Sequence, residues 1–228
     1  MSFQEFWSEL NGSRVEGELI RTILYSLITS FVILAIMYFV RFRDIENFMG
    51  KYGYFLFFAA ISYSLIIPTI RQVRAYKQCA CMTGMMIGMT IGMVAGFLAG
   101  FYIASTNGMF VGSIFGMIIG ITLGIWMGGS CCGVMGFMEG IMAGFMGALM
   151  GAMTAFMLLN DNLKIITPII FLVSAVILLS LNYMIYNEMK NEQRQRREDH
   201  FWTMAISFVL TLVTAWLMVF GPRTGIFG

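Results

Sequence analysis

Long apolar runs recur along almost all of this 228-residue chain, and they constrain its fold more than any other feature. A helix needs roughly 17–25 mostly apolar residues to cross the hydrocarbon core of a bilayer. Backbone groups in that core must pair within the protein, so such runs predict helices rather than open sheets. Seven runs qualify: residues 20–40, 54–70, 80–104, 108–128, 132–158, 165–186 and 201–220. We therefore expect an all-α, polytopic membrane bundle of about seven transmembrane helices in contact with the lipid bilayer.

Charged residues are scarce in this chain, at 11% of the sequence against about 25% in a soluble domain. The predicted helices leave no room for a separate soluble domain, so residues 20–228 form a single transmembrane domain. The net charge is only +2, and no basic face with interleaved aromatic residues occurs. Nucleic acid is therefore not an expected partner.

The first 19 residues differ from a cleaved signal peptide, because they hold four glutamates where such a peptide is basic and then apolar. Phe3, Phe6, Trp7 and Leu10 recur with the spacing of one helical face. This pattern predicts an amphipathic helix over residues 1–19. It either lies on the inner membrane surface or packs beneath the bundle.

The loops differ in charge between the two sides of the predicted bundle. With seven spans, the side that holds the N-terminus has nine of the Lys and Arg residues, and the other side has five. Positive residues favour the cytoplasmic side. We expect the plasma (cytoplasmic) membrane, with the N-terminus inside and the C-terminus outside.

Residues 79–158 form a central unit of unusual composition, with 18 of the 25 glycines, 15 of the 22 methionines and all four cysteines. Small residues at every fourth position let membrane helices approach closely. The glycines step by four in each of the three runs: Gly84, Gly88, Gly92, Gly96 and Gly100; Gly108, Gly112, Gly116, Gly120, Gly124 and Gly128; Gly136, Gly140 and Gly144. The spacing predicts a tightly packed glycine-zipper core made by the third to fifth helices.

Soft ligands accompany these glycines. In the fifth run, Cys132, Glu139 and Met146 are seven residues apart and therefore share one stripe of a helix. In the third run, Cys79 and Cys81 come directly before a series of methionines at helical spacing. The predicted topology brings Cys79 and Cys81 to the same cytoplasmic end as Cys131 and Cys132.

Thiolate and thioether ligands select Cu(I) over hard cations such as Mg²⁺. A ladder of weak thioether sites also suits conduction, which requires that an ion can leave each site. Paired cysteines on a reducing side favour metal binding or redox activity over a structural disulfide. The candidate ligands are Cys79, Cys81, Cys131, Cys132, Met82, Met86, Met89, Met135, Met138, Met142, Met146, Met150 and Glu139. They predict a protein that binds and moves or delivers Cu(I).

The same residues have plainer interpretations. Methionine fills irregular gaps beside glycine, and cysteine is often a core residue. Glu139 is either a partner for a passing cation or proton, or a neutral acid held by a hydroxyl of Ser113, Thr122 or Ser130. The alternative functions are therefore a structural or assembly subunit of a larger membrane complex held by glycine zippers, and a proton or cation conductor that uses Glu139. The partner would be a second copy of the chain or another protein of that complex. The sequence has no motif of a known enzyme chemistry, so an enzyme is not expected.

The MxxxM spacing beside GxxxG resembles the motif logic of eukaryotic high-affinity copper transporters. Paired cysteines at a helix start resemble those of mercuric-ion uptake proteins. Both resemblances cover short motifs only, and both families differ from this chain in the number of spans. They imply soft-metal handling and assign a role to no individual residue.

Overall fold

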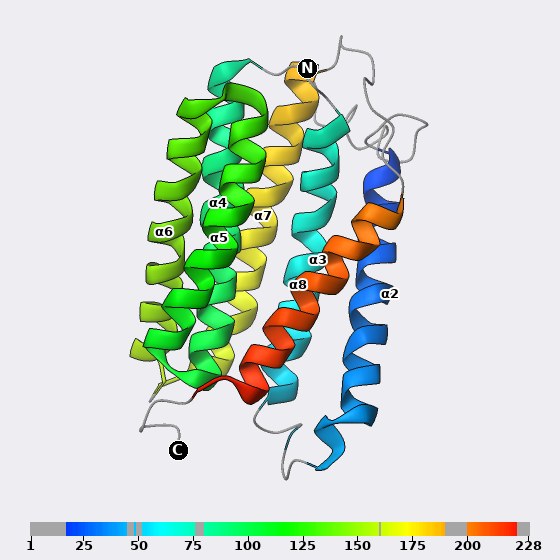
Figure 1. Ribbon diagram of the computed structural model, residues 1–228, viewed down its shortest axis with the longest axis vertical. Helices are drawn as coiled ribbons and strands as arrows, with labels where there is room; N and C mark the ends of the chain where they lie inside the picture. The colour runs from blue at the N-terminus through cyan, green and yellow to red at the C-terminus, as the bar shows by residue number, and fades with distance from the viewer. Residues whose placement is uncertain are drawn as a thin grey trace.

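The computed structural model describes residues 17–44, 48, 52–75, 80–159, 161–189 and 200–222. Within these residues the chain contains seven long helices and no strand, as the apolar runs predict (Figure 1). The helices are α2 (Gly17–Val40), α3 (Tyr54–Ala75), α4 (Cys81–Asn107), α5 (Met109–Cys132), α6 (Val134–Met157), α7 (Leu163–Met189) and α8 (His200–Phe220), with a 3-10 turn, η1 (Phe42–Asp44), after α2. The amphipathic helix expected over residues 1–19 lies outside the described residues, except for residues 17–19, which belong to α2.

Six of these helices, α2 to α7, are long and apolar enough to cross a membrane. The apolar part of α8, Met204–Phe220, is shorter. Consecutive helices run in opposite directions, so α2, α4, α6 and α8 all begin at the same end of the bundle (Figure 1). We call this end the N side and the other end the far side.

Two prolines lie inside helices. The second predicted run ends at residue 70, two residues after Pro68, but α3 continues to Ala75. Membrane helices tolerate proline where other groups satisfy the backbone that it frees. Pro168 in α7 also lies inside a helix, and there another group replaces the missing backbone donor. Proline cannot donate to the carbonyl four residues earlier, on Lys164, and the hydroxyl of Tyr54 from α3 donates to that oxygen at 2.7 Å.

The connections of the central unit are shorter than expected. Residues 105–107 and 129–131 lie between the predicted runs, but the structure includes both segments in helices. Single glycines make the two turns instead: Gly108, with φ 105°, joins α4 to α5, and Gly133, with φ 62°, joins α5 to α6. A positive φ costs glycine little, because it has no Cβ. The three helices therefore fold back on each other with almost no loop.

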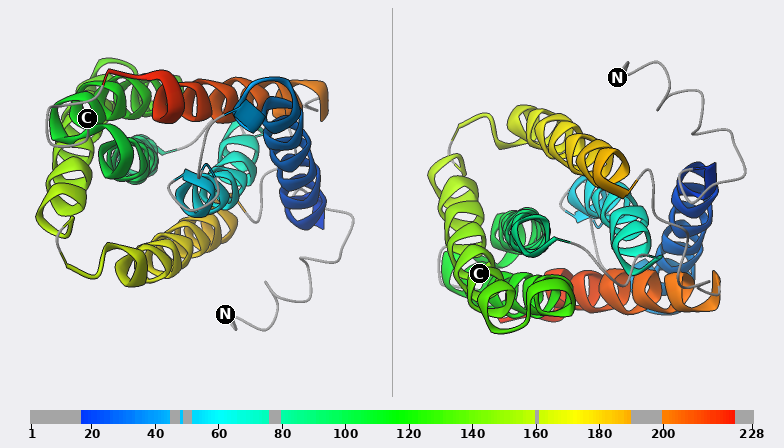
Figure 2. Two further views of the ribbon diagram at one scale, coloured as in Figure 1. Left: turned by 90° about the horizontal axis from the view of Figure 1, so that it is seen from below. Right: turned by 90° about the horizontal axis from the view of Figure 1, so that it is seen from above.

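The helices form two groups that meet at α4. Helices α4, α5 and α6 pack on one another far more closely than on the rest, while α2, α3 and α8 form the other group. Viewed along the bundle, α4 lies between α5 and α6 on one side and α3 and α7 on the other (Figure 2). Tyr63 of α3 and Tyr102 of α4 are fully buried in the core between the groups.

Hydroxyl groups join α2 to α8. The hydroxyl of Ser207 lies 3.0 Å from that of Ser26 and 3.1 Å from that of Ser30, and all three side chains are fully buried. Ser30 also lies 3.1 Å from the hydroxyl of Thr211. We call Ser26, Ser30, Ser207 and Thr211 the hydroxyl cluster.

Candidate metal centre

Glycine allows the backbones of α4, α5 and α6 to touch. A Cβ placed on Gly88 would lie 2.6 Å from the Cα of Gly128, and one on Gly116 would lie 2.8 Å from the Cα of Gly100. Between α5 and α6, a Cβ on Gly124 would lie 2.6 Å from the carbonyl oxygen of Gly140. Real Cβ atoms do not approach backbone so closely. The glycine sides of these three helices therefore face one another and fill the interior of the unit.

The methionines of α6 consequently lie on the opposite side of that helix. Met138, Met142, Met146 and Met150 are between 52% and 60% exposed. They stand two residues away from Gly136, Gly140, Gly144 and Ala148 in the chain, or about 200° around the helix. This outer row of four methionines, Met138, Met142, Met146 and Met150, therefore lines no path inside the chain.

The methionines of α4 have a different setting. Met86, Met89 and Met93 line a groove of about 590 Å³ between α4 and α7. The opposite wall includes Ile169, Val173 and Ile177 of α7. The hydroxyl of Thr90 in the groove donates to the carbonyl of Met86 in its own helix. The three thioether sulfurs are therefore the softest ligands that this groove offers.

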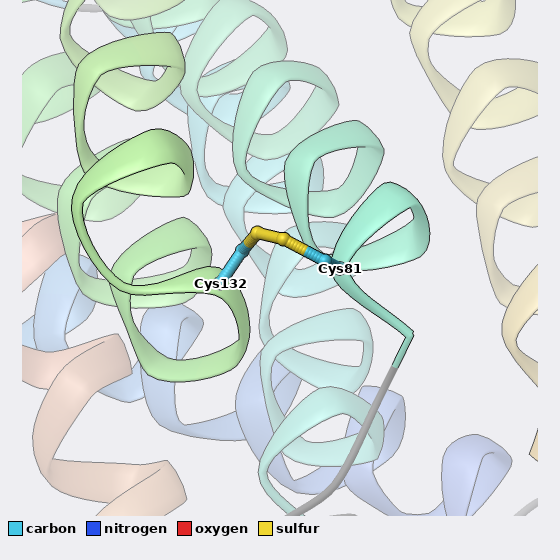
Figure 3. Close-up of a disulfide and its surroundings, with 2 residues drawn as sticks. All are labelled: Cys81 and Cys132. Carbon is cyan, nitrogen blue, oxygen red and sulfur yellow. A yellow bond between two sulfur atoms is a disulfide. The ribbon is translucent and has the colours of Figure 1, made fainter.

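Two of the four cysteines meet at the N side. Cys81 begins α4 and Cys132 ends α5, and their sulfur atoms form a disulfide, with the two Cα atoms 4.8 Å apart (Figure 3). The prediction that these two residues share one end of the unit is confirmed. Cys79 lies outside the described residues, as does the side chain of Cys131, whose backbone belongs to α5.

Methionines flank this cysteine pair. Met82, the residue after Cys81, is 76% exposed, and Met135, three residues after Cys132, is 63% exposed. Met82 shares the first turn of α4 with Cys81, and Met135 lies in the first turn of α6, which follows Cys132 after the Gly133 turn. Two cysteines and two thioethers therefore gather at the N side of the unit.

Glu139 lies in the second turn of α6 and is partly exposed. Cys132 is the last residue of α5, so the prediction that Cys132 and Glu139 share one stripe of a single helix was wrong. None of the hydroxyls expected to hold it does so. Ser113, Thr122 and Ser130 each donate to a carbonyl four residues earlier in α5, those of Met109, Ile118 and Trp126. Among the described residues Glu139 has no hydrogen bond or ion pair, so its carboxyl group is open to the surroundings of α6.

Sequence reasoning missed a set of buried polar residues near the N side of α3. Arg71 donates to the hydroxyl of Thr22 at 2.9 Å, and the amide nitrogen of Gln72 donates to the main-chain oxygen of Asn182 at 3.3 Å. The guanidinium of Arg74 lies 4.9 Å from the ring centre of Trp126. The only sequence signal was Asn182 inside the otherwise apolar run 165–186, because Arg71, Gln72 and Arg74 follow the run 54–70 and were assigned to a loop.

A side-chain hydrogen bond joins α4 to α7 close to the cysteine pair. The hydroxyl of Thr83 donates a short hydrogen bond to Glu188. Among the described residues, no three His, Cys, Asp or Glu side chains gather closely enough to hold a metal ion. A metal centre at the N side would therefore combine the cysteine pair with thioethers.

The six long apolar helices define this chain as an integral membrane protein. Comparison with protein-family models, with curated proteins and with solved structures gives no match.

Proposed function

We propose that this protein binds a soft monovalent metal ion, Cu(I) above all, and moves it across the membrane or delivers it to another protein. The observation that carries the proposal is the meeting of the Cys81 and Cys132 sulfur atoms at the N side. Thiolate sulfur selects Cu(I) and related soft ions. Once reduced, two cysteines that are already neighbours chelate such an ion without a large rearrangement of the helices.

The loading site comprises the four cysteines with the nearest thioethers. Cys79 and Cys131 are close to the pair in sequence, and Met82 and Met135 stand beside it. Thiolates bind Cu(I) more strongly than thioethers do, so the ion is held at the N side first. With the N-terminus in the cytoplasm, these cysteines face a reducing compartment, which favours the thiol form that binds metal.

The path away from the loading site follows Met86, Met89 and Met93 along the groove between α4 and α7. Each thioether is a weak ligand, so an ion can pass from one to the next. The outer row on α6 joins the path where a second copy of the chain or a partner covers it. Glu139 then supplies a negative charge beside the passing cation.

A second function, as a structural or assembly subunit, is favoured by the glycine contacts. The close approaches run along most of α4, α5 and α6, which is how a glycine zipper is built. In this reading the methionines only fill space beside lipid or a partner. Conduction of protons or other cations through Glu139 is a third reading, supported by its lack of a partner within the described residues.

Copper uptake by sealed vesicles that contain the purified protein separates these readings. Replacing all four cysteines by serine should abolish tight binding and reduce uptake at least tenfold. Leucine at Met86, Met89 and Met93 together should reduce uptake several-fold and leave tight binding in place. The matched control is Met37→Leu in α2, which lies away from the glycine unit and should behave like the parent.

Two further variants sharpen the result. Leucine at all four methionines of the outer row should reduce uptake only if a second chain covers that row. Glu139→Gln should reduce uptake or change its pH dependence. If the cysteine, groove, outer-row and Glu139 variants all handle copper like the parent, the metal proposal is wrong and the assembly subunit is the better account.

A further inference from the structure

The cysteine pair is placed where small reagents can reach it. Cys81 is exposed and Cys132 is partly exposed, at the end of the bundle rather than within its packed interior. The separation of 4.8 Å between their Cα atoms lies within the usual range for a disulfide. Accessible disulfides are the ones that thiols reduce and that proteins use for regulation.

Backbone contacts beside the cysteine pair hold α4 and α5 together in addition to the disulfide. Gly88 lies seven residues after Cys81, and Gly128 lies four residues before Cys132. A Cβ on Gly88 would lie 2.6 Å from the Cα of Gly128, so the two backbones touch just inside the pair. Below that contact, a Cβ on Gly92 would lie 3.1 Å from the Cα of Gly124. When the disulfide opens, these contacts keep the two sulfur atoms close together.

We propose that the Cys81–Cys132 pair is a redox gate on metal loading: the disulfide form excludes Cu(I), and the dithiol form chelates it. This inference rests on the proposed function and adds its regulation. In the disulfide each sulfur is bonded to the other, and neither can become a thiolate. Only the reduced pair offers two thiolates at a separation that the glycine contacts fix.

A low-molecular-weight thiol can reduce the Cys81–Cys132 disulfide in two exchange steps. Its thiolate attacks one cysteine sulfur, the S–S bond breaks, and the other cysteine leaves as a thiolate. A second reductant molecule then attacks the mixed disulfide, releases the first cysteine and forms the disulfide of the reductant. Two electrons pass to the protein. Cu(I) then replaces the two thiol protons, and exchange with the oxidised reductant reverses the sequence once the metal has left.

The test compares the oxidised and reduced full-length protein in detergent. Each form is incubated with Cu(I) and passed over a chelator resin, and the retained copper is measured per chain. Alkylation followed by mass spectrometry reports the redox state of Cys81 and Cys132 individually. We expect the reduced form to retain at least ten times more copper than the oxidised form. Cys81→Ser cannot form this disulfide, so its copper retention should be lower than that of the reduced parent and should differ little between the two treatments.

Each outcome decides a different point. If both forms retain equal copper, the gate is wrong and the metal proposal stands. If the reduced form retains none although alkylation shows both cysteines free, the metal proposal fails and the gate fails with it. If Cys81 and Cys132 remain alkylatable after oxidation, the pair does not close and the gate is wrong for that reason alone. Protection of both cysteines from oxidation by bound Cu(I) would support the gate independently.

Discussion

The helices within each of the two groups of this bundle are held together in a different way. In the α4, α5 and α6 unit, glycines bring backbones into contact, and no side chain lies between them at those points. Between α2 and α8, buried side-chain hydroxyls of the hydroxyl cluster bridge the gap. Lipid provides no hydrophobic drive between helices, so every interface needs either close packing or hydrogen bonds. This chain uses close packing in the α4, α5 and α6 unit and hydrogen bonds between α2 and α8.

The comparison implies unequal tolerance to substitution. A backbone contact cannot move aside for a new side chain, whereas losing one hydroxyl removes a single interaction. Interhelical hydrogen bonds in membranes contribute about 0.6 kcal/mol on average and about 1.7 kcal/mol at most. Overpacking a tight core costs about 1–3 kcal/mol, or more where nothing can yield. The glycine unit should therefore be the more fragile of the two regions.

The largest effect is expected from leucine at the centre of a glycine contact. Gly92→Leu, Gly116→Leu and Gly140→Leu should each lower the free energy of unfolding by about 3 kcal/mol or prevent folding, because their new side chains meet backbone. The matched control is Gly129→Leu, since a Cβ there meets nothing within 4 Å. Denaturant unfolding in detergent measures the difference. Equal stability of all four variants would refute the close-packing argument.

A smaller loss is expected in the hydroxyl cluster. Ser207→Ala removes contacts with Ser26 and Ser30 together and should lower the free energy of unfolding by about 1 kcal/mol. Thr29→Ala is the control on α2, because the hydroxyl of Thr29 donates to the carbonyl of Tyr25 in its own helix. The same unfolding measurement applies. A loss at Thr29 as large as that at Ser207 would show that the bridging hydroxyls have no special role.

The hydrogen bond from Tyr54 to the carbonyl of Lys164, one turn before Pro168, permits a double-mutant cycle. Tyr54→Phe should lower the free energy of unfolding by about 0.5–1.5 kcal/mol, because the carbonyl of Lys164 loses its donor. In a Pro168→Ala background the backbone N–H of residue 168 can supply that donor, so Tyr54→Phe should cost less there. Equal costs in the two backgrounds would mean that the tyrosine does not compensate for the proline.

The smallest effect is expected on the outer face of α6. Leucine at all four methionines of the outer row should change the free energy of unfolding of the single chain by about 0.5 kcal/mol or less, because these side chains are exposed. Chemical crosslinking of the same samples reports self-association. A loss of several kcal/mol that accompanies the loss of a crosslinked dimer would show that a second chain covers this row.

Much of this architecture could be predicted from sequence, because apolar length and glycine spacing act locally. Each predicted span corresponds to one helix, and the meeting of Cys81 and Cys132 followed from counting alternate spans. The outward direction of the outer row was also present in the sequence, since Met142 stands two residues from Gly140 and Gly144. The prediction considered only how the soft ligands align with one another. It did not consider that the glycines occupy the inward face of the same helix.

Other features depend on partners far apart in the chain. The continuation of α3 beyond Pro68 was not predictable from local rules, because proline usually ends a helix in water. Ser26 and Ser30 step by four on α2, but only folding pairs them with Ser207, which is 181 residues from Ser26. For Cys81 and Cys132, which are 51 residues apart, the order of the spans predicted a shared end of the unit but not the bond between the two sulfur atoms. Such pairings become visible only once the helices are placed together.

The most direct measurement is X-ray absorption at the copper edge of the reduced, full-length protein after loading with Cu(I) and removal of loosely held metal by a chelator. The account predicts retained copper with only sulfur in its first coordination shell, and loss of that copper in the Cys81→Ser, Cys132→Ser double variant. Retained copper with a nitrogen or oxygen shell that the double variant leaves unchanged, or no retained copper at all, would contradict it.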